Sequence, residues 1–188
     1  MSSCFVWRQI IQQISPKRIL EVGSYEGRST CFLIEDCKSL EELVCVDIWA
    51  GNPEWLGYDR GKMPQVERRF DSNTLLAQSR GPQPIGLRKI KDLSSQALAS
   101  LIGNKEAHFD LVYVDGSHEA PDVLTDAVNA FHLLRIGGVL VFDDYIWRGK
   151  DVLNVPKIAI DAFVNIFHRK VVVLSAILYQ LYVRKTAA

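Results

Sequence analysis

The sequence predicts an α/β protein in which a doubly wound, mostly parallel sheet is covered by helices on both faces. Short apolar runs, typical of buried strands, alternate along the chain with longer stretches of helical periodicity. Glycine or aspartate residues stand at the ends of several of these runs, and ligands bind beside strand ends in sheets of this kind.

The strands are expected where apolar runs are bounded by turn residues. The seven expected strands are 18–22, 43–47, 85–90, 109–115, 139–142, 171–174 and 177–183. The third run is weaker and indicates an edge strand. The last two runs are close enough in sequence to form an antiparallel pair, which completes a seven-stranded sheet.

The helices are expected where apolar residues recur every three or four positions. They cover 5–14, 28–34, 65–78, 94–101, 156–167 and a segment that begins at Pro121. Proline suits the first turn of a helix, and Gly137-Gly138 is expected to stop this one. The segment 50–64 is rich in glycine and proline, and we interpret it either as a lid over a substrate or as a surface excursion.

Composition limits the possible classes of protein. A chain of 188 residues fits a single domain, 1–188, with a proper core. Lys and Arg number 22, as do Asp and Glu, which argues against a general nucleic-acid binder. The four cysteines have no metal-site spacing, and no segment resembles a signal peptide or a membrane span. We therefore expect a cytoplasmic protein with no nucleic-acid or membrane partner.

The segment around Gly23 and Gly27 is the first candidate binding site. A predicted strand, a glycine turn and a helix N-terminus follow one another here, and the first N–H groups of the helix have no partner within it. Gly23 would let the chain turn sharply and Gly27 would let it approach a ligand. The same pattern also occurs as plain α/β architecture.

Asp47 ends the second predicted strand and is a candidate for binding a ribose diol. Ile48 and Trp49 follow it and could offer an apolar wall and an aromatic face to adenine or to a substrate. The alternative for Asp47 is a solvated carboxylate at a strand end.

Asp115, Asp143 and Asp144 end two strands that this fold would make neighbours. Three carboxylates at one edge repel one another unless a cation, a proton or hydrogen bonds compensate their charge. Oxygen ligands favour a hard divalent ion such as Mg²⁺, with Mn²⁺ or Ca²⁺ as other possibilities. In a second interpretation Asp115 contacts a cofactor, while Asp143 and Asp144 cap the following loop without a metal.

The spacing Glu21-x-Gly23-x-x-x-Gly27 resembles the first motif of class I S-adenosylmethionine-dependent methyltransferases, and the resemblance implies a Rossmann-like fold. The three acids are similar to the metal triad of catechol O-methyltransferase-like enzymes. The turn 114–118 and the run 159–163 are similar to the macrocin O-methyltransferase and cephalosporin hydroxylase-like branch.

The resemblance implies a set of cofactor contacts. They are Glu21, Gly23, Ser24, Tyr25, Gly27, Ser29, Asp47, Ile48, Asp92, Leu93 and Asp115. By resemblance, Asp92 would meet the adenine amino group, although an Asp before a helix is often a turn or cap residue.

His118 is the candidate catalytic base, together with Asp115 as a catalytic residue. It stands three residues after Asp115, where the catechol-type pattern has a lysine, and its ordinary pKa suits proton transfer near neutrality. It could instead bind the metal or cap the next helix. Tyr145 and Trp147 could flank the acceptor or serve only in packing.

The expected function is S-adenosylmethionine-dependent, Mg²⁺-assisted methyl transfer to a hydroxylated small molecule. One alternative is a metal-independent methyltransferase that relies on His118. Another is a non-catalytic cofactor-binding domain, or one whose acceptor pocket is completed by a partner subunit, as in a homo-oligomer.

Overall fold

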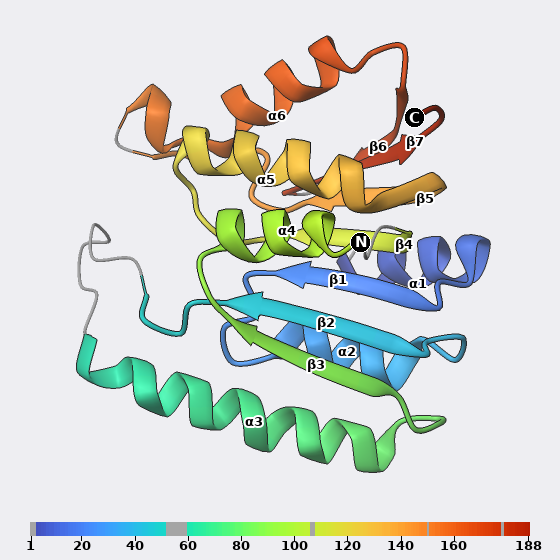
Figure 1. The fold of residues 1–188 in the computed structure, drawn as a ribbon, viewed down its shortest axis with the longest axis vertical. Coiled ribbons are helices and arrows are strands. Elements are labelled where there is room, and N and C mark those ends of the chain that lie inside the picture. Colours follow the sequence, from blue (N-terminus) through green and yellow to red (C-terminus); the bar gives the residue numbers. More distant parts are fainter. Residues whose placement is uncertain (1–2, 52–59, 106–107, 150, 178) are drawn as a thin grey trace.

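The sheet has the predicted class, a mostly parallel doubly wound arrangement with an antiparallel pair at one side. The computed structural model describes residues 3–51, 60–105, 108–149, 151–177 and 179–188. Within these residues the strands are β1 (Arg18–Val22), β2 (Glu42–Asp47), β3 (Gly86–Lys91), β4 (Phe109–Val114), β5 (Leu134–Phe142), β6 (Val171–Ile177) and β7 (Gln180–Lys185). They form one seven-stranded sheet in the order β3-β2-β1-β4-β5-β7-β6 (Figure 1).

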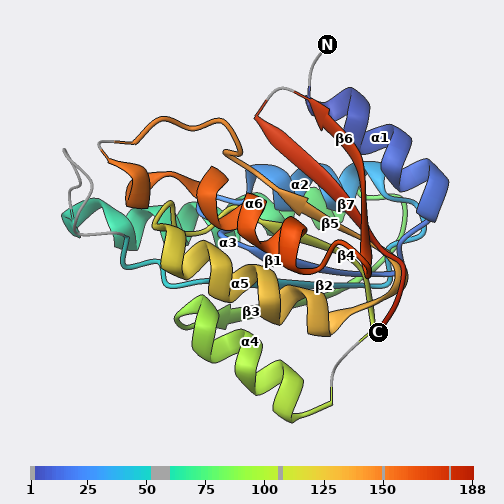
Figure 2. The same ribbon diagram turned by 90° about the horizontal axis from the view of Figure 1, so that it is seen from above.

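Helices cover both faces of this sheet. The α-helices of the described segments are α1 (Ser3–Ile14), α2 (Arg28–Asp36), α3 (Met63–Arg80), α4 (Ser94–Gly103), α5 (Ala120–Leu133) and α6 (Pro156–Ile166), and the short 3₁₀ helices are η1 (Arg60–Lys62) and η2 (Val152–Asn154). Figure 2 shows α4, α5 and α6 on one side of the sheet and α1 and α2 on the other.

The core is divided by the sheet into two clusters. One joins apolar residues of α4, α5 and α6 to the side chains that point to that face of the strands. The other joins α1, α2 and α3 to the opposite face. Both clusters bury side chains of β1, β2, β4 and β5, which explains why these strands are nearly continuous apolar runs.

The strand order identifies the edge of the sheet at which a ligand would bind. β1 pairs with β2 on one side and with β4 on the other, so the chain reverses its direction of winding between β1 and β4. Ligands bind outside the carboxyl ends of the strands at such a reversal. The turns after β1 and β4 meet at this point.

Several boundaries differ from the sequence-based prediction. The expected helix stop at Gly137-Gly138 lies inside β5, because α5 already ends at Leu133 and the strand begins at the next residue. Here the pairing of β4 with β5 shifts register, and a Cβ on Gly138 would lie 2.9 Å from the carbonyl oxygen of Asp110. The turn of the last hairpin also lies later than expected, since β6 continues to Ile177.

Helix α3 begins at Met63, and Pro64 takes its place in the first turn rather than in the preceding loop. Of the candidate lid 50–64, residues 52–59 lie outside the described residues, so the lid stays a prediction. No helix in the described parts of the chain combines the length and the apolar character needed to cross a bilayer.

Candidate functional site at the carboxyl edge of the sheet

The turn between β1 and α2 is closely fitted to the end of β4. Gly23 has φ +87°, and a Cβ on it would lie 1.9 Å from the carbonyl oxygen of Asp115. Gly27, with φ +83°, is the N-cap of α2, and a Cβ there would lie 3.1 Å from the ring of Phe70. Both positions lie in the left-handed region that glycine adopts most easily. The two glycines therefore fix the shape of the turn.

Glu21 stabilises this turn through hydrogen bonds from the buried end of β1. Its side chain is fully buried, and its carboxylate accepts hydrogen bonds from the hydroxyl groups of Ser24, Ser29 and Thr30. Burial raises the pKa of Glu21, while the three hydroxyl groups act in the opposite direction. The predicted contacts Glu21, Ser24 and Ser29 thus lie together, and both serines donate hydrogen bonds to Glu21. Thr30 belongs to the same group and is absent from the predicted set.

Asp47 connects the end of β2 to the glycine turn. Its Oδ2 accepts a hydrogen bond of 2.8 Å from the N–H of Tyr25, and its Oδ1 accepts one of 2.7 Å from the N–H of Trp49. A carboxylate has room for about four hydrogen bonds, so each oxygen can accept another from a ligand. The indole of Trp49 is buried against Phe70, so it does not offer its face to a ligand as the sequence suggested. Ile48 is half-buried beside it.

Asp92 and Leu93 follow β3, the edge strand, and both are exposed. The carboxylate of Asp92 accepts a hydrogen bond of 2.8 Å from the N–H of Leu93. The N–H of Asp92 in turn donates to the carbonyl of Asp47 at 3.2 Å. The two residues therefore lie next to the end of β2, on the same edge as the other predicted contacts.

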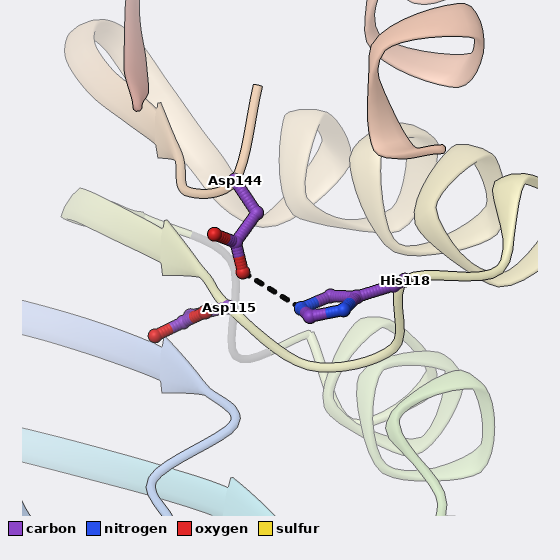
Figure 3. A group of neighbouring side chains, drawn as sticks. All are labelled: Asp115, His118 and Asp144. Carbon is purple, nitrogen blue, oxygen red and sulfur yellow. Dashed lines mark ion pairs between the residues drawn. The ribbon is translucent and has the colours of Figure 1, made fainter. Parts of the chain in front are cut away.

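Asp115, His118 and Asp144 form a cluster at the ends of β4 and β5 (Figure 3). One ligand atom from each lies within 4.8 Å of the others, and Nε2 of His118 is 2.7 Å from Oδ2 of Asp144. Burial, together with the charges of Asp143 and Asp144, raises the pKa of Asp115 to about 8. Such a cluster can hold a proton or a divalent cation.

Asp143 faces a different set of partners. Its Oδ2 accepts hydrogen bonds from the hydroxyl of Tyr113 and from the side-chain amide of Gln180, the latter at 2.8 Å. The side-chain oxygen Oε1 of Gln180 accepts hydrogen bonds from the indole N–H of Trp7, at 2.9 Å, and from the hydroxyl of Tyr182. The structure thus brings together two of the three predicted metal ligands with His118, while Asp143 joins a buried polar network.

Sequence reasoning missed this network. Gln180 interrupts an otherwise apolar segment, and that interruption was the available signal. Tyr113 lies in an apolar run, where a buried aromatic ring gives no sign in the sequence that its hydroxyl is hydrogen-bonded. Only the register of β4 against β5 brings that hydroxyl to Asp143. Its hydroxyl also contacts Asp115 at 2.9 Å.

Trp147 contacts the cluster from the segment that follows β5. Its ring lies 5.0 Å from the ring of His118, and 43% of the residue is exposed. Tyr145 instead donates a hydrogen bond of 2.8 Å from its hydroxyl to Asp161 on α6. Of the aromatic residues considered beside the acceptor, Trp147 is the one that borders His118.

Comparison with known proteins gives a family match. A family model described as a methyltransferase domain matches residues 20–145. Tricin synthase 1 of Oryza sativa subsp. japonica is 26% identical over a match of 143 residues, and the match covers 74% of this chain and 50% of that protein. The chain therefore spans about half the length of this curated relative.

Solved structures share the fold at low sequence identity. The O-methyltransferase TomG from Streptomyces achromogenes, solved in complex with S-adenosylmethionine, has a TM-score of 0.67 and 17% identity over 100% of this chain and 82% of its own. An O-methyltransferase from Bacillus cereus, solved with S-adenosylhomocysteine, has a TM-score of 0.67 and 18% identity over 98% of this chain and 82% of its own.

Proposed function

This chain belongs to the methyltransferase domain family, and from that premise we propose that it transfers a methyl group from S-adenosylmethionine to a hydroxyl oxygen of a small molecule. The observation that carries the proposal is the meeting of the glycine turn, Asp47 and the Asp115–His118–Asp144 cluster at one edge of the sheet. The names of TomG and of the Bacillus cereus protein as O-methyltransferases support oxygen as the acceptor atom.

The residues present fit the cofactor. Asp47 has oxygens free to accept hydrogen bonds from the two ribose hydroxyls while it keeps its bonds to Tyr25 and Trp49. The exposed carboxylate of Asp92 would accept from the adenine amino group. The turn at Gly23 and Gly27 would lie beside the amino-acid part. When bound, the cofactor supplies an electrophilic methyl group.

His118 would act on the acceptor hydroxyl. A neutral hydroxyl is a poor nucleophile, so an imidazole that takes up its proton speeds the reaction by about 10²–10⁴-fold. Asp144, 2.7 Å from Nε2 of His118, would stabilise the imidazolium that results. This short contact favours a second candidate function, a methyltransferase that needs no metal.

The cluster also fits a divalent cation. Two carboxylates and one imidazole within 4.8 Å are a ligand set for such an ion. Burial first, and then the charges of neighbouring carboxylates, raise the pKa of Asp115, and a cation would compensate the charge of this buried group. Such an ion would lower the pKa of a hydroxyl on the acceptor. Mg²⁺ is the ion expected from the carboxylates, and a nitrogen ligand would favour Mn²⁺. We propose Asp115 and Asp144 as ligands, with Asp143 or His118 as the third.

Cofactor binding is the first test. We expect titration calorimetry to show S-adenosylhomocysteine binding to the wild-type chain, and Asp47→Asn to weaken it by about ten- to a hundredfold, because hydrogen bonds to a charged group are lost. Asp36→Asn is the matched control, since that carboxylate pairs with Arg8 at the surface. A wild-type chain without affinity, or an Asp47→Asn variant that binds equally well, would contradict the proposal.

Methyl transfer to a panel of catechols and sugars, with and without EDTA, is the second test. His118→Gln should lower the rate by about 10²–10⁴-fold and flatten its dependence on pH near neutrality, with little change in S-adenosylhomocysteine affinity. Full turnover in EDTA would exclude the metal-dependent mechanism and support the metal-independent one. Loss of turnover in EDTA, together with its loss in Asp143→Asn/Asp144→Asn, would support the cation. Cofactor binding without transfer to any acceptor would support a non-catalytic domain.

A further inference from the structure

An open groove beside the cluster is lined by the segment that connects β5 to α6 and by the first turn of α6. Its volume is about 520 Å³, and we call it the β5–α6 groove, lined among others by Ile146, Trp147, Arg148, Val152 and Lys157. Small-molecule sites commonly have volumes of about 300–1,000 Å³. Ile146, Trp147 and Val152 are 47%, 43% and 61% exposed. Large apolar side chains gathered at the surface in this way mark a binding surface.

The groove adjoins the reacting groups. Trp147 lines it and also packs against His118, with ring centres 5.0 Å apart. Pro156, whose neighbours Val155 and Lys157 line the groove, borders the small space between Asp115, His118 and Asp144. A molecule lying against Trp147 would therefore have one end near His118.

Contacts within the segment fix the shape of the groove. The side-chain amide of Asn154 donates to both carboxylate oxygens of Glu119, at 2.6 and 2.7 Å. Asp151 accepts hydrogen bonds from the N–H groups of Leu153 and Asn154. Gly149 packs so closely that a Cβ on it would lie 2.0 Å from the carbonyl oxygen of Asn154. The groove is thus preformed rather than assembled by the ligand.

The charges of the groove are unequal. Lys157 forms an ion pair with Asp161 at 2.5 Å, and it also donates a hydrogen bond of 3.0 Å to the hydroxyl of Tyr145. The carboxylate of Asp151 is engaged by two backbone N–H groups. Arg148 has no carboxylate within ion-pair distance among the residues that the structure describes. Among the groove residues that the structure describes, its guanidinium is therefore the charge that a ligand can compensate, and guanidinium groups pair well with carboxylate and phosphoryl groups.

We propose that the β5–α6 groove binds the acceptor, and that this acceptor has a flat apolar body and an anionic carboxylate or phosphoryl group. The flat part stacks on Trp147, the anion pairs with Arg148, and the hydroxyl that receives the methyl group points to His118. This inference rests on the proposed function and narrows its substrate class.

Two pairs of probes test the anion. Titration calorimetry with saturating S-adenosylhomocysteine compares 3,4-dihydroxybenzoate with its methyl ester, and phenyl phosphate with phenol. We expect at least one anion to bind about tenfold more tightly than its neutral partner, because it forms a charge-assisted pair. The pair that shows the preference distinguishes a carboxylate from a phosphoryl group.

Variants assign the preference to Arg148. Arg148→Gln should remove it by weakening the anion about tenfold while the neutral probe binds within about twofold of wild type. Arg169→Gln, which changes another exposed arginine after α6, should leave the preference intact. Trp147→Ala should weaken both members of a pair, because both stack on the indole.

Several results would overturn the inference. Equal binding of anion and neutral probe, no binding of any probe, or a preference that survives Arg148→Gln would each do so. These results are distinguishable from failure of the proposed function, in which S-adenosylhomocysteine itself does not bind.

Discussion

The Tyr113 hydroxyl lies between the carboxylates of Asp115 and Asp143 and has a single proton to donate. Gln180 already donates to Asp143, so the interactions of Asp143 are better satisfied than those of Asp115. Burial and the neighbouring charges raise the pKa of Tyr113, which keeps its proton on the phenol. Asp115 is therefore the member of the group that most needs a proton or a cation.

Asp126 is a second buried acid, on α5 and outside the cluster. It is 1% exposed, and neither oxygen accepts a hydrogen bond of good geometry from a described residue, although the nearby Ser94 hydroxyl lowers its pKa somewhat. Burial, with a smaller contribution from the charge of Asp122, raises the pKa of Asp126 to about 7. The folded chain therefore holds a proton here between about pH 4 and pH 7 that the unfolded chain releases.

We predict that Asp126→Asn stabilises the protein at high pH. Because the folded-state pKa is raised, this group makes the free energy of unfolding fall as pH rises from about 4 to 7. The variant should match wild type near pH 4 and exceed it by up to roughly 4 kcal/mol at pH 8. Urea unfolding at several pH values measures the difference. Asp122→Asn, at an exposed position one turn earlier, should change the free energy of unfolding little at any of these pH values. A difference between Asp126→Asn and wild type that does not depend on pH would contradict the prediction.

At the scale of elements, the junction of β1 and β4 depends on Gly23. We predict that Gly23→Ala lowers the free energy of unfolding by roughly 2–4 kcal/mol, because the new Cβ would meet backbone atoms of Asp115 and φ is positive. Affinity for S-adenosylhomocysteine should fall at least tenfold, since the turn must shift. Urea unfolding and calorimetry measure both.

Gly103, at the end of α4, provides the matched control. A Cβ there has no atom within 4 Å, so Gly103→Ala should leave stability unchanged or raise it by up to about 1 kcal/mol. If the two variants were equally stable, the close approach at Gly23 would have no energetic importance.

At the scale of the whole molecule, the last strand contacts the junction at which α5 ends and β5 begins. Lys185 on β7 is 7% exposed and donates to the carbonyl oxygens of Phe131 and Leu134, at 2.7 and 2.8 Å. We predict that Lys185→Met lowers the free energy of unfolding by about 1–3 kcal/mol, because two buried carbonyls lose their donor. Lys170→Met, at an exposed position nearby, should change it by less than about 0.5 kcal/mol, and equal effects of the two variants would argue against this role.

The sequence was sufficient to predict the sheet class, the antiparallel last pair and the edge at which the acids gather, because apolar periodicity and strand ends depend on neighbouring residues. The sequence was insufficient to predict hydrogen bonds between side chains that only the tertiary fold brings together. Gln180 and Trp7 are 173 positions apart, and the orientation of Asp143 depends on both. The prediction that Gly137-Gly138 stops the helix was wrong, because glycine is also required where a strand packs closely against its neighbour. Here the neighbour is the backbone of Asp110.

The backbone of Asp144 has φ +54°, in the left-handed region. Its side chain contacts His118, whereas the side chain of the preceding Asp143 contacts Tyr113 and Gln180. Asparagine and glycine tolerate that conformation best, whereas alanine or a β-branched residue would resist it. Asp144→Asn consequently alters charge with the main chain left in place, but Asp144→Val would change both at once. Any measurement at this position is only as informative as the choice of its replacement.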